Sequence, residues 1–220
     1  MSAIARLYPI VDAACFSSTE DLANFAEALV AGGCTLLQYR NKTGNTRVML
    51  EQARELKKLL GSHPTLAKNA TVGWGTQGPV RLIMNDRADL CLAAEFDGVH
   101  VGQDDLSPQA VRRIIGPDRW LGVSTHNPEQ LQEADRTSAD YLAIGPVFST
   151  SSKEKPDPVV GLEGVRRARR LTRKPLVAIG GITRANAVSV IEAGADFVAV
   201  ISDLLREPRK SAEEFFRILR

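Results

Sequence analysis

A group of polar side chains at strand spacing is the first sign of chemistry in this chain. Gln38, Arg40 and Lys42 occupy alternate positions in a segment that begins with apolar residues. Residues at i, i+2 and i+4 share one face of a strand, and such a face within a protein core would be apolar. An amide and two cations on one face therefore indicate a strand that ends in a cavity holding an anionic ligand.

Acidic residues at the ends of other apolar runs have the composition of a metal site. One run ends at Asn85 and Asp86, and the next is followed by Asp104 and Asp105. Two carboxylates from neighbouring strand ends suit Mg²⁺, which keeps several waters and often bridges to substrate phosphates. We expect Asp86 and Asp105 to form the pair, with Asp104 as the alternative to Asp105. Taken singly, each aspartate could instead cap the helix that follows it.

Later segments have the composition of phosphate-binding loops. Residues 145–153 carry a run of hydroxyl side chains that ends in Lys153, and hydroxyls, backbone amides and lysine all bind phosphate oxygens. Gly180 and Gly181 follow the seventh apolar run, and glycine lets a backbone approach a phosphate closely. Ile201 and Ser202 follow the eighth. A solvated linker and a tight turn are the structural alternatives for the hydroxyl-rich and glycine segments.

The elements that must position these residues alternate along the chain. Segments of helical periodicity separate eight apolar, strand-like runs: Leu7 to Val11, Thr35 to Arg40, Arg81 to Asn85, Gly98 to Val101, Trp120 to Ser124, Tyr141 to Val147, Pro175 to Ile179 and Phe197 to Ile201. Parallel neighbours need right-handed helical crossovers, and eight such units close a sheet. The sequence predicts an α/β fold, a TIM (β/α)8 barrel, as a single domain over residues 1–220. A doubly wound sheet is the alternative, but no Gly-x-Gly-x-x-Gly follows the first strand.

Cap signals and one irregular stretch refine this prediction. Ser17, Asn127 and Ser211 each begin a pattern typical of a helix start. Residues 61–79 are too long and too rich in glycine for a simple turn, so we expect an insertion there.

Composition narrows the classes of function. The 28 Lys and Arg residues against 26 Asp and Glu leave a net charge of +2, too small to indicate a nucleic-acid or anionic-membrane partner. No apolar run reaches the roughly 18 residues of a membrane helix, and the start lacks the apolar stretch of a signal peptide, so we expect a cytoplasmic protein. Cys15, Cys34 and Cys91 are too widely spaced to indicate a zinc site or a disulfide framework. The sequence does not decide between a monomer and a homo-oligomer.

If the predicted barrel forms, its mouth holds two anion-binding zones. One combines Arg40, Lys42 and Lys153 with the acidic pair, and the other combines the glycine pair with residues 201–202. A single phosphate needs only one zone, so two zones indicate two phosphorylated ligands or one doubly phosphorylated ligand. The expected metal favours a pyrophosphate in the first zone.

Six different motifs stand at the ends of these runs, and together they extend over nearly the whole chain. They are Gln-Tyr-Arg-Asn-Lys (38–42), Asn-Asp-Arg-Ala-Asp-Leu (85–90), Asp-Gly-Val-His-Val-Gly-Gln-Asp-Asp-Leu (97–106), Gly-Val-Ser-Thr-His (122–126), Gly-Pro-Val-Phe-Ser-Thr-Ser-Ser-Lys (145–153) and Ala-Ile-Gly-Gly-Ile-Thr (178–183). In this order they resemble the motifs of the thiamine-phosphate synthase family. Six matches together are specific, whereas the Gly-Gly loop alone would fit many phosphate-binding barrels.

The resemblance implies a Mg²⁺-dependent transferase with two small phosphorylated substrates. It would join 4-amino-2-methyl-5-hydroxymethylpyrimidine pyrophosphate to 4-methyl-5-(2-hydroxyethyl)thiazole phosphate, giving thiamine phosphate and pyrophosphate through a dissociative pyrimidine cation. The motifs assign the pyrimidine pyrophosphate to Gln38, Tyr39, Arg40, Asn41, Lys42, Asn85, Ser124 and Lys153, with catalytic roles for Arg40, Lys42, Ser124 and Lys153. They assign Mg²⁺ to Asp86 and Asp105, and the thiazole phosphate to Thr150, Ser151, Ser152, Gly181, Ile201 and Ser202. Asn41 departs from the acid that the family often has at this position.

Three other functions would use related architecture. A thiazole tautomerase would not need the cations and acids of the first zone. A phosphosugar epimerase or aldolase would need a base pair or a Schiff-base lysine deep in the barrel, and no lysine lies inside the expected strands. A regulatory ligand-binding barrel could keep the phosphate site without catalysis, so only an assay for the condensation separates it from the transferase.

Overall fold

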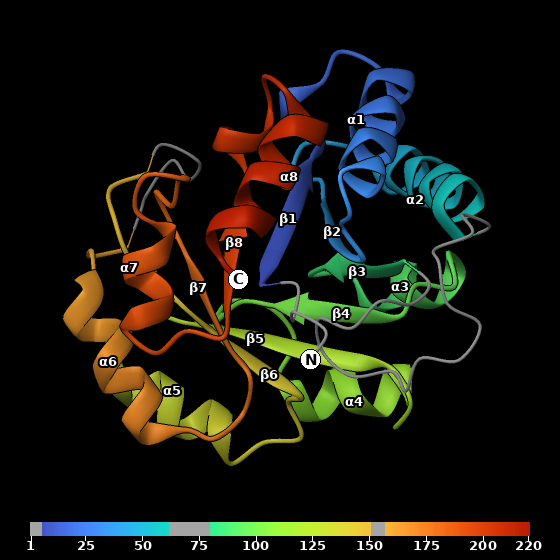
Figure 1. The fold of residues 1–220 in the computed structure, drawn as a ribbon. Coiled ribbons are helices and arrows are strands. Elements are labelled where there is room, and N and C mark those ends of the chain that lie inside the picture. Colours follow the sequence, from blue (N-terminus) through green and yellow to red (C-terminus); the bar gives the residue numbers. More distant parts are fainter. Residues whose placement is uncertain (1–5, 62–79, 151–156) are drawn as a thin grey trace.

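The computed structural model describes residues 6–61, 80–150 and 157–220, so most of the expected insertion at 61–79 lies outside the described residues. Eight parallel strands close into a barrel in chain order, with β1 paired to β8 (Figure 1). The strands are β1 (Leu7–Asp12), β2 (Leu36–Arg40), β3 (Arg81–Asn85), β4 (Gly98–Val101), β5 (Trp120–Thr125), β6 (Tyr141–Ile144), β7 (Leu176–Ile179) and β8 (Phe197–Val200). The predicted TIM barrel is confirmed.

Helices follow the strands and surround the barrel (Figure 1). They are α1 (Thr19–Ala31), α2 (Thr46–Gly61), α3 (Ala88–Ala93), α4 (Pro108–Ile115), α5 (Pro128–Asp135), α6 (Gly161–Leu171), α7 (Ala187–Glu192) and α8 (Pro208–Ile218). Short 3₁₀ helices, η1 (Ala13–Cys15) and η2 (Ser202–Leu204), follow β1 and β8. Each βα unit therefore brings the carboxyl end of its strand to the same rim of the barrel.

The helix starts follow the cap signals in part. Asn127 caps α5 as predicted, because its side chain accepts a hydrogen bond from a backbone N–H of the first turn. Ser18 rather than Ser17 caps α1. The last helix begins at Pro208, before the predicted Ser211, since the fixed φ of proline suits the first helical turn.

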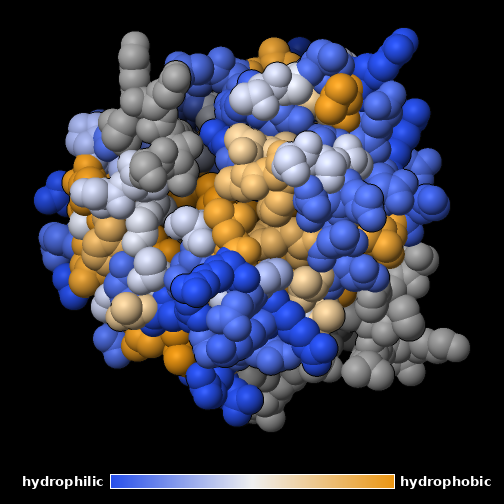
Figure 2. Space-filling view, turned by 90° about the horizontal axis from the view of Figure 1, so that it is seen from above, coloured by the Kyte–Doolittle hydropathy of each residue, from blue (hydrophilic) through white to orange (hydrophobic). Residues whose placement is uncertain are grey.

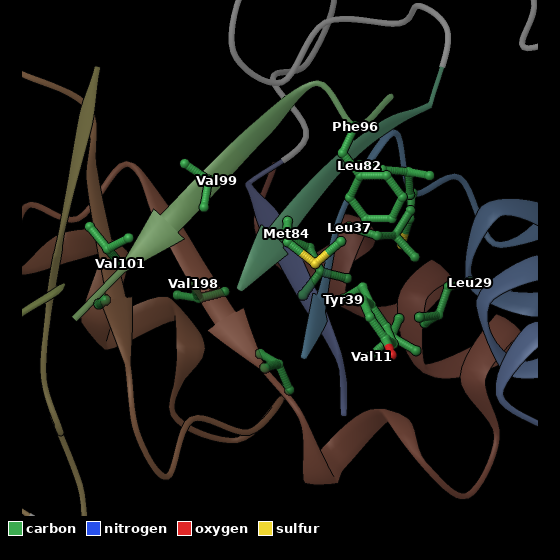
Figure 3. Close-up of a cluster of buried hydrophobic side chains, with 14 of the residues drawn as sticks. Val11, Leu29, Leu37, Tyr39, Leu82, Met84, Phe96, Val99, Val101 and Val198 are labelled. Atoms are coloured by element: carbon green, nitrogen blue, oxygen red, sulfur yellow. The ribbon is translucent and has the colours of Figure 1, made fainter. Parts of the chain in front are cut away.

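The core has two layers, separated by the strands. An inner cluster fills the barrel and contains Tyr8, Ile10, Leu36, Ile83, Tyr141, Ala143, Val177, Phe197 and Ala199. A larger cluster lies between the strands and the helices. Figure 3 shows part of this outer layer, with Leu29 of α1 among side chains from the strands. Side chains that alternate along a strand enter different layers, so the inner face of each strand leads up to the rim.

Three aspartates occupy equivalent positions at the opposite, amino end of the barrel, each directly before an even-numbered strand. Asp97, Asp140 and Asp196 accept hydrogen bonds of 2.7–2.9 Å from backbone N–H groups of β3, β5 and β7 respectively. Each also pairs with a cation of the helix that precedes the odd-numbered strand: Lys57 of α2 (3.4 Å), Arg112 of α4 (2.6 Å) and Arg169 of α6 (2.8 Å). We call these three arrangements the basal clamps. Each one ties a helix and two successive strands together.

The exposed large hydrophobic residues of the described chain are Leu92, Leu106, Ile114, Val159, Val188 and Leu205. Figure 2 shows one face, where hydrophilic residues surround a smaller area of hydrophobic ones. Within the described ranges, no helix combines the length and the hydropathy needed to cross a membrane.

Candidate active site

The inner face of β2 leads from the barrel core to its rim. Gln38 is buried, and its Nε2 donates a hydrogen bond of 3.1 Å to the hydroxyl of Tyr8. Two residues further on, Arg40 forms an ion pair with Asp12 at the end of β1. The alternation that the sequence suggested is therefore present for Gln38 and Arg40, whereas Lys42 lies in the loop beyond the strand, because β2 ends at Arg40. The pair brings an amide and a cation to the rim at the junction of β1 and β2.

Asp12 is a site residue that the sequence reasoning missed. It is 5% exposed, and besides pairing with Arg40 it accepts a hydrogen bond from the Ala14 backbone in η1. A carboxylate held in this way fixes the position of the guanidinium. Its place directly after the first apolar run is a signal that could have found it, because the other candidates were chosen at the ends of such runs.

The two residues between the inward positions of the first motif face elsewhere. Tyr39 lies in the outer layer (Figure 3). Its hydroxyl donates to Oε1 of Gln52 on α2 at 2.6 Å. The side chain of Asn41 accepts hydrogen bonds from the backbone N–H groups of Thr43 and Gly44, at 3.0 and 2.7 Å. Asn41 thus shapes the loop that carries Lys42, and the structure does not bring either side chain to the cluster of Gln38 and Arg40.

Lys42, Asp86 and Asp105 meet at the rim beside β3 and β4. The Nζ of Lys42 lies 2.5 Å from Oδ2 of Asp86, and Asp105 is close enough to interact with the same carboxylate. Burial raises the pKa of Asp86, and the neighbouring Asp105 adds to this effect, whereas Lys42 opposes it. A buried carboxylate beside a second one is stabilised by a cation, so Asp86 and Asp105 are the residues that could hold a divalent metal ion.

The backbone holds both acids in place. Asp86 has φ of 62°, a left-handed conformation that aspartate and asparagine tolerate better than most residues, and its N–H donates to the His100 carbonyl at 2.7 Å. Oδ2 of Asp105 accepts from the N–H of Gly102 at 2.7 Å. Neither acid caps a helix: Arg87 precedes α3, and Ser107 caps α4.

Asn85 carries an orphaned polar atom next to this acidic pair. The residue is 9% exposed, and its Nδ2 is buried without a hydrogen-bond partner in the described part of the chain. A buried N–H group left unpaired costs about 1–3 kcal/mol. An acceptor atom of a bound ligand would remove that cost, and a phosphate oxygen is such an acceptor.

Ser124, on the inner face of β5, forms a hydrogen bond with the buried His100. Nε2 of His100 lies 2.8 Å from Oγ of Ser124, and Nδ1 lies 3.0 Å from the hydroxyl of Tyr141. Burial lowers the pKa of His100 to about 4, although Asp105 acts in the opposite direction. His100 is therefore a neutral, hydrogen-bonded residue at pH 7.

The depressed pKa of His100 predicts a loss of stability in acid. Between pH 6.5 and pH 4, His100 binds a proton in the unfolded chain but stays neutral in the folded protein. The free energy of unfolding is therefore unaffected by His100 above pH 6.5 and decreases as the pH falls toward 4, by up to roughly 3 kcal/mol. Urea denaturation between pH 7 and pH 4 should show a shallower decline for His100→Gln than for the wild type. Identical slopes would contradict the prediction.

The loops after β6, β7 and β8 form the other side of the rim. Gly180 and Gly181 have φ of 102° and 62°, and a Cβ on Gly181 would lie 2.5 Å from the Ser149 carbonyl. The β7 loop therefore packs directly on the loop that leads to Thr150. Arg184 ties the β7 loop to the β8 loop, because its Nε lies 3.0 Å from Oδ2 of Asp203 in η2.

These contacts place some of the predicted thiazole-phosphate residues on connected loops. Thr150 and Gly181 lie on the contacting β6 and β7 loops, and Ile201 and Ser202 lie at the start of η2. Ser151, Ser152 and Lys153 lie outside the described residues. Their roles stay predictions.

The chain is similar to known proteins over nearly its whole length. The family model for thiamine monophosphate synthase matches residues 7–204. A thiamine-phosphate synthase of Koribacter versatilis is 58% identical over 219 residues, which cover 98% of this chain and 96% of the relative. One of Chloroflexus aurantiacus is 43% identical over 197 residues, covering 90% and 83%.

Solved structures agree with these sequence matches. The thiamine phosphate pyrophosphorylase of Pyrococcus furiosus has a TM-score of 0.79 and 33% identity, covering 98% of this chain and 95% of that protein. A tryptophan synthase complex of the same organism, at 17% identity and a TM-score of 0.69, shares the fold alone. The extent of the family match and the identity to its members lead to one conclusion: this chain belongs to the thiamine monophosphate synthase family.

Proposed function

We propose that this chain condenses 4-amino-2-methyl-5-hydroxymethylpyrimidine pyrophosphate with 4-methyl-5-(2-hydroxyethyl)thiazole phosphate. The observation that carries the proposal is the rim cluster in which Arg40, Lys42 and the unpaired amide of Asn85 accompany two close carboxylates. This cluster has the donors for a diphosphate and a metal ion together. Family membership supplies the identity of the two substrates.

The diphosphate would bind at the side of the rim formed by β2, β3 and β4. Arg40 can donate in a fork to phosphate oxygens, and Lys42 can supply a point charge. Asn85 would donate its free N–H to the same group. Asp86 and Asp105 would hold Mg²⁺, which would neutralise charge on the diphosphate oxygens. Lys42, now paired with Asp86, would then be available to the diphosphate.

The reaction needs positioning and charge stabilisation rather than a protein nucleophile. The bond between the pyrimidine methylene carbon and its diphosphate oxygen breaks, and the electron pair leaves with pyrophosphate. The electron-rich aminopyrimidine carries the resulting positive charge until the thiazole nitrogen forms the new C–N bond. Arg40 and Lys42 would stabilise the departing negative charge, and a single well-placed donor contributes about 3–4 kcal/mol in comparable sites.

The thiazole phosphate would bind at the connected β6, β7 and β8 loops. The backbone of Gly181 and the Ser202 region would receive the phosphate, and Thr150 would add a hydroxyl. Holding both reactants in one mouth removes much of the entropy cost of a bimolecular step, which can reach about 7–11 kcal/mol in favourable cases.

An assay with pure protein, both substrates and Mg²⁺ tests the proposal. We expect thiamine phosphate and pyrophosphate to appear in equal amounts, and neither to appear when either substrate is omitted. Conversion of a thiazole carboxylate phosphate to its tautomer would instead favour the related tautomerase. Tight binding of both substrates without any product would favour a regulatory barrel.

A further inference from the structure

Five polar side chains form one continuous hydrogen-bond chain through the barrel interior. Nε2 of Gln38 lies 3.1 Å from the hydroxyl of Tyr8, which lies 2.9 Å from the hydroxyl of Tyr141. Tyr141 is 3.0 Å from Nδ1 of His100, and Nε2 of His100 is 2.8 Å from Oγ of Ser124. We call these five residues the buried chain. Its members come from β2, β1, β6, β4 and β5, so it crosses the barrel and joins two residues of the pyrimidine site.

The positions of the hydrogens follow from counting donors. Nε2 of Gln38 can only donate, so the Tyr8 oxygen accepts there and its own hydrogen goes to Tyr141. Tyr141 then donates to Nδ1 of His100. A neutral imidazole that accepts at Nδ1 carries its single proton on Nε2, and that proton goes to Oγ of Ser124.

The two ends of the buried chain therefore have opposite hydrogen-bonding roles: one is an acceptor and the other is a donor. Gln38 uses an N–H group inside the barrel, which leaves Oε1 as an acceptor, and no hydrogen bond to Oε1 is found among the described residues. Ser124 accepts from His100, which leaves its hydroxyl hydrogen as a donor. Tyr8, Tyr141 and Gln38 are all at most 3% exposed, so solvent cannot readily replace a missing link.

We propose that the buried chain fixes Gln38 as an acceptor and Ser124 as a donor toward the aminopyrimidine ring. Tyr8, Tyr141 and His100 then act as positioning residues, without touching the substrate. A 4-aminopyrimidine offers an amino N–H group and, on the far side of the ring, a second nitrogen, which complement an acceptor and a donor on different strands. The proposal rests on the proposed function, because that function supplies the pyrimidine.

The tautomer of His100 tests the proposal without any assay of activity. Reversal of the Gln38 amide would reverse every link, place the His100 proton on Nδ1 and turn Ser124 into an acceptor. The ¹⁵N NMR spectrum of protein labelled at histidine distinguishes the two forms, and His100→Gln identifies the signal among the three histidines. We expect a proton on Nε2. A proton on Nδ1 would overturn the proposal even if the enzyme is fully active.

Removal of one link should weaken pyrimidine recognition selectively. In Tyr141→Phe we expect the ¹⁵N signals of His100 to shift and the KM for the pyrimidine substrate to rise about five- to tenfold, the scale of one hydrogen bond. The KM for the thiazole phosphate should stay unchanged. Tyr8→Phe, which breaks the neighbouring link, should act in the same direction and gives a second variant if Tyr141→Phe does not fold.

Tyr39→Phe is the control for the loss of a buried tyrosine hydroxyl, and two results would refute the proposals. Tyr39→Phe removes another buried tyrosine hydroxyl, but from the outer layer, and should leave the His100 signals in place. Equal increases in both KM values in the folded Tyr8 and Tyr141 variants would indicate general distortion and refute selective positioning. A wild-type enzyme that forms no thiamine phosphate would refute the proposed function instead, while the His100 tautomer would still report on the buried chain.

Discussion

Replacement of Gly122 by alanine should destabilise the folded barrel by about 3 kcal/mol or more. A Cβ at this position on β5 would lie 2.1 Å from Cζ of Tyr141 and 2.4 Å from Nδ1 of His100. Both neighbours are buried and joined by a hydrogen bond, so neither can move without breaking that link. Overpacking of a core typically costs about 1–3 kcal/mol, and the broken link adds to it. Urea denaturation of the two proteins at pH 7 measures the difference.

Gly61→Ala is the matched control for this prediction. Gly61 ends α2, and a Cβ there meets nothing closer than 3.7 Å, from the Lys57 side chain. Alanine at a compatible helical position is neutral or stabilising by up to about 1 kcal/mol. If Gly122→Ala unfolds at the same urea concentration as Gly61→Ala, the inner layer has room that the structure does not show.

Asp86→Asn should keep the fold yet lose about a hundredfold or more of the Mg²⁺-supported activity. Asparagine has the same shape and tolerates the left-handed backbone of this position. It removes the charge that would hold the metal ion, and a bound metal ion supplies several kcal/mol of charge stabilisation, which corresponds to about a hundredfold or more in rate. Titration of the initial rate with Mg²⁺ should show a higher half-saturating concentration together with the lower maximum. An unaltered titration would exclude Asp86 as a metal ligand.

Asp118→Asn supplies the comparison for the charge change. Asp118 is exposed and precedes β5, at the amino end of the barrel. The substitution changes the net charge by the same amount as Asp86→Asn, so an effect of net charge on the whole protein would appear in both variants. We expect Asp118→Asn to show the wild-type Mg²⁺ titration. Thermal unfolding of both variants confirms that the comparison is between folded proteins.

The strands and the inner face of β2 could be predicted because they depend on local pattern. Apolar runs mark the strands, and the two-residue period of a strand places Gln38 and Arg40 on one face, with Tyr39 in the outer layer. The sixth run was predicted to reach Val147, but β6 ends at Ile144. Pro146 has no N–H group to donate to a ladder, so the regular strand stops before it, although the N–H of Val147 still donates to the Ile179 carbonyl of β7 at 2.8 Å.

Contacts between distant strands could not be predicted in the same way. The hydroxyls of Tyr8 and Tyr141 are hydrogen-bonded although the residues are 133 positions apart in the sequence. In the sequence alone, neither tyrosine differs from an ordinary core residue. The pairing of Asp12 with Arg40 likewise depends on the register between β1 and β2, in which these two residues are partners. Only the closed barrel sets such registers, which no local pattern contains.

The basal clamps also separate the part of the barrel that must stay constant from the part that can change. Their sequence spans run over residues 57–97, 112–140 and 169–196, and the loop after β6 falls in the gap between the second and the third. An insertion in that loop does not lengthen the chain between the two residues of any basal clamp, because the loop follows the second clamp and precedes the third. The length of this loop can therefore change while the amino end of the barrel keeps its geometry, whereas its composition is constrained by the predicted phosphate-binding residues Thr150 to Lys153.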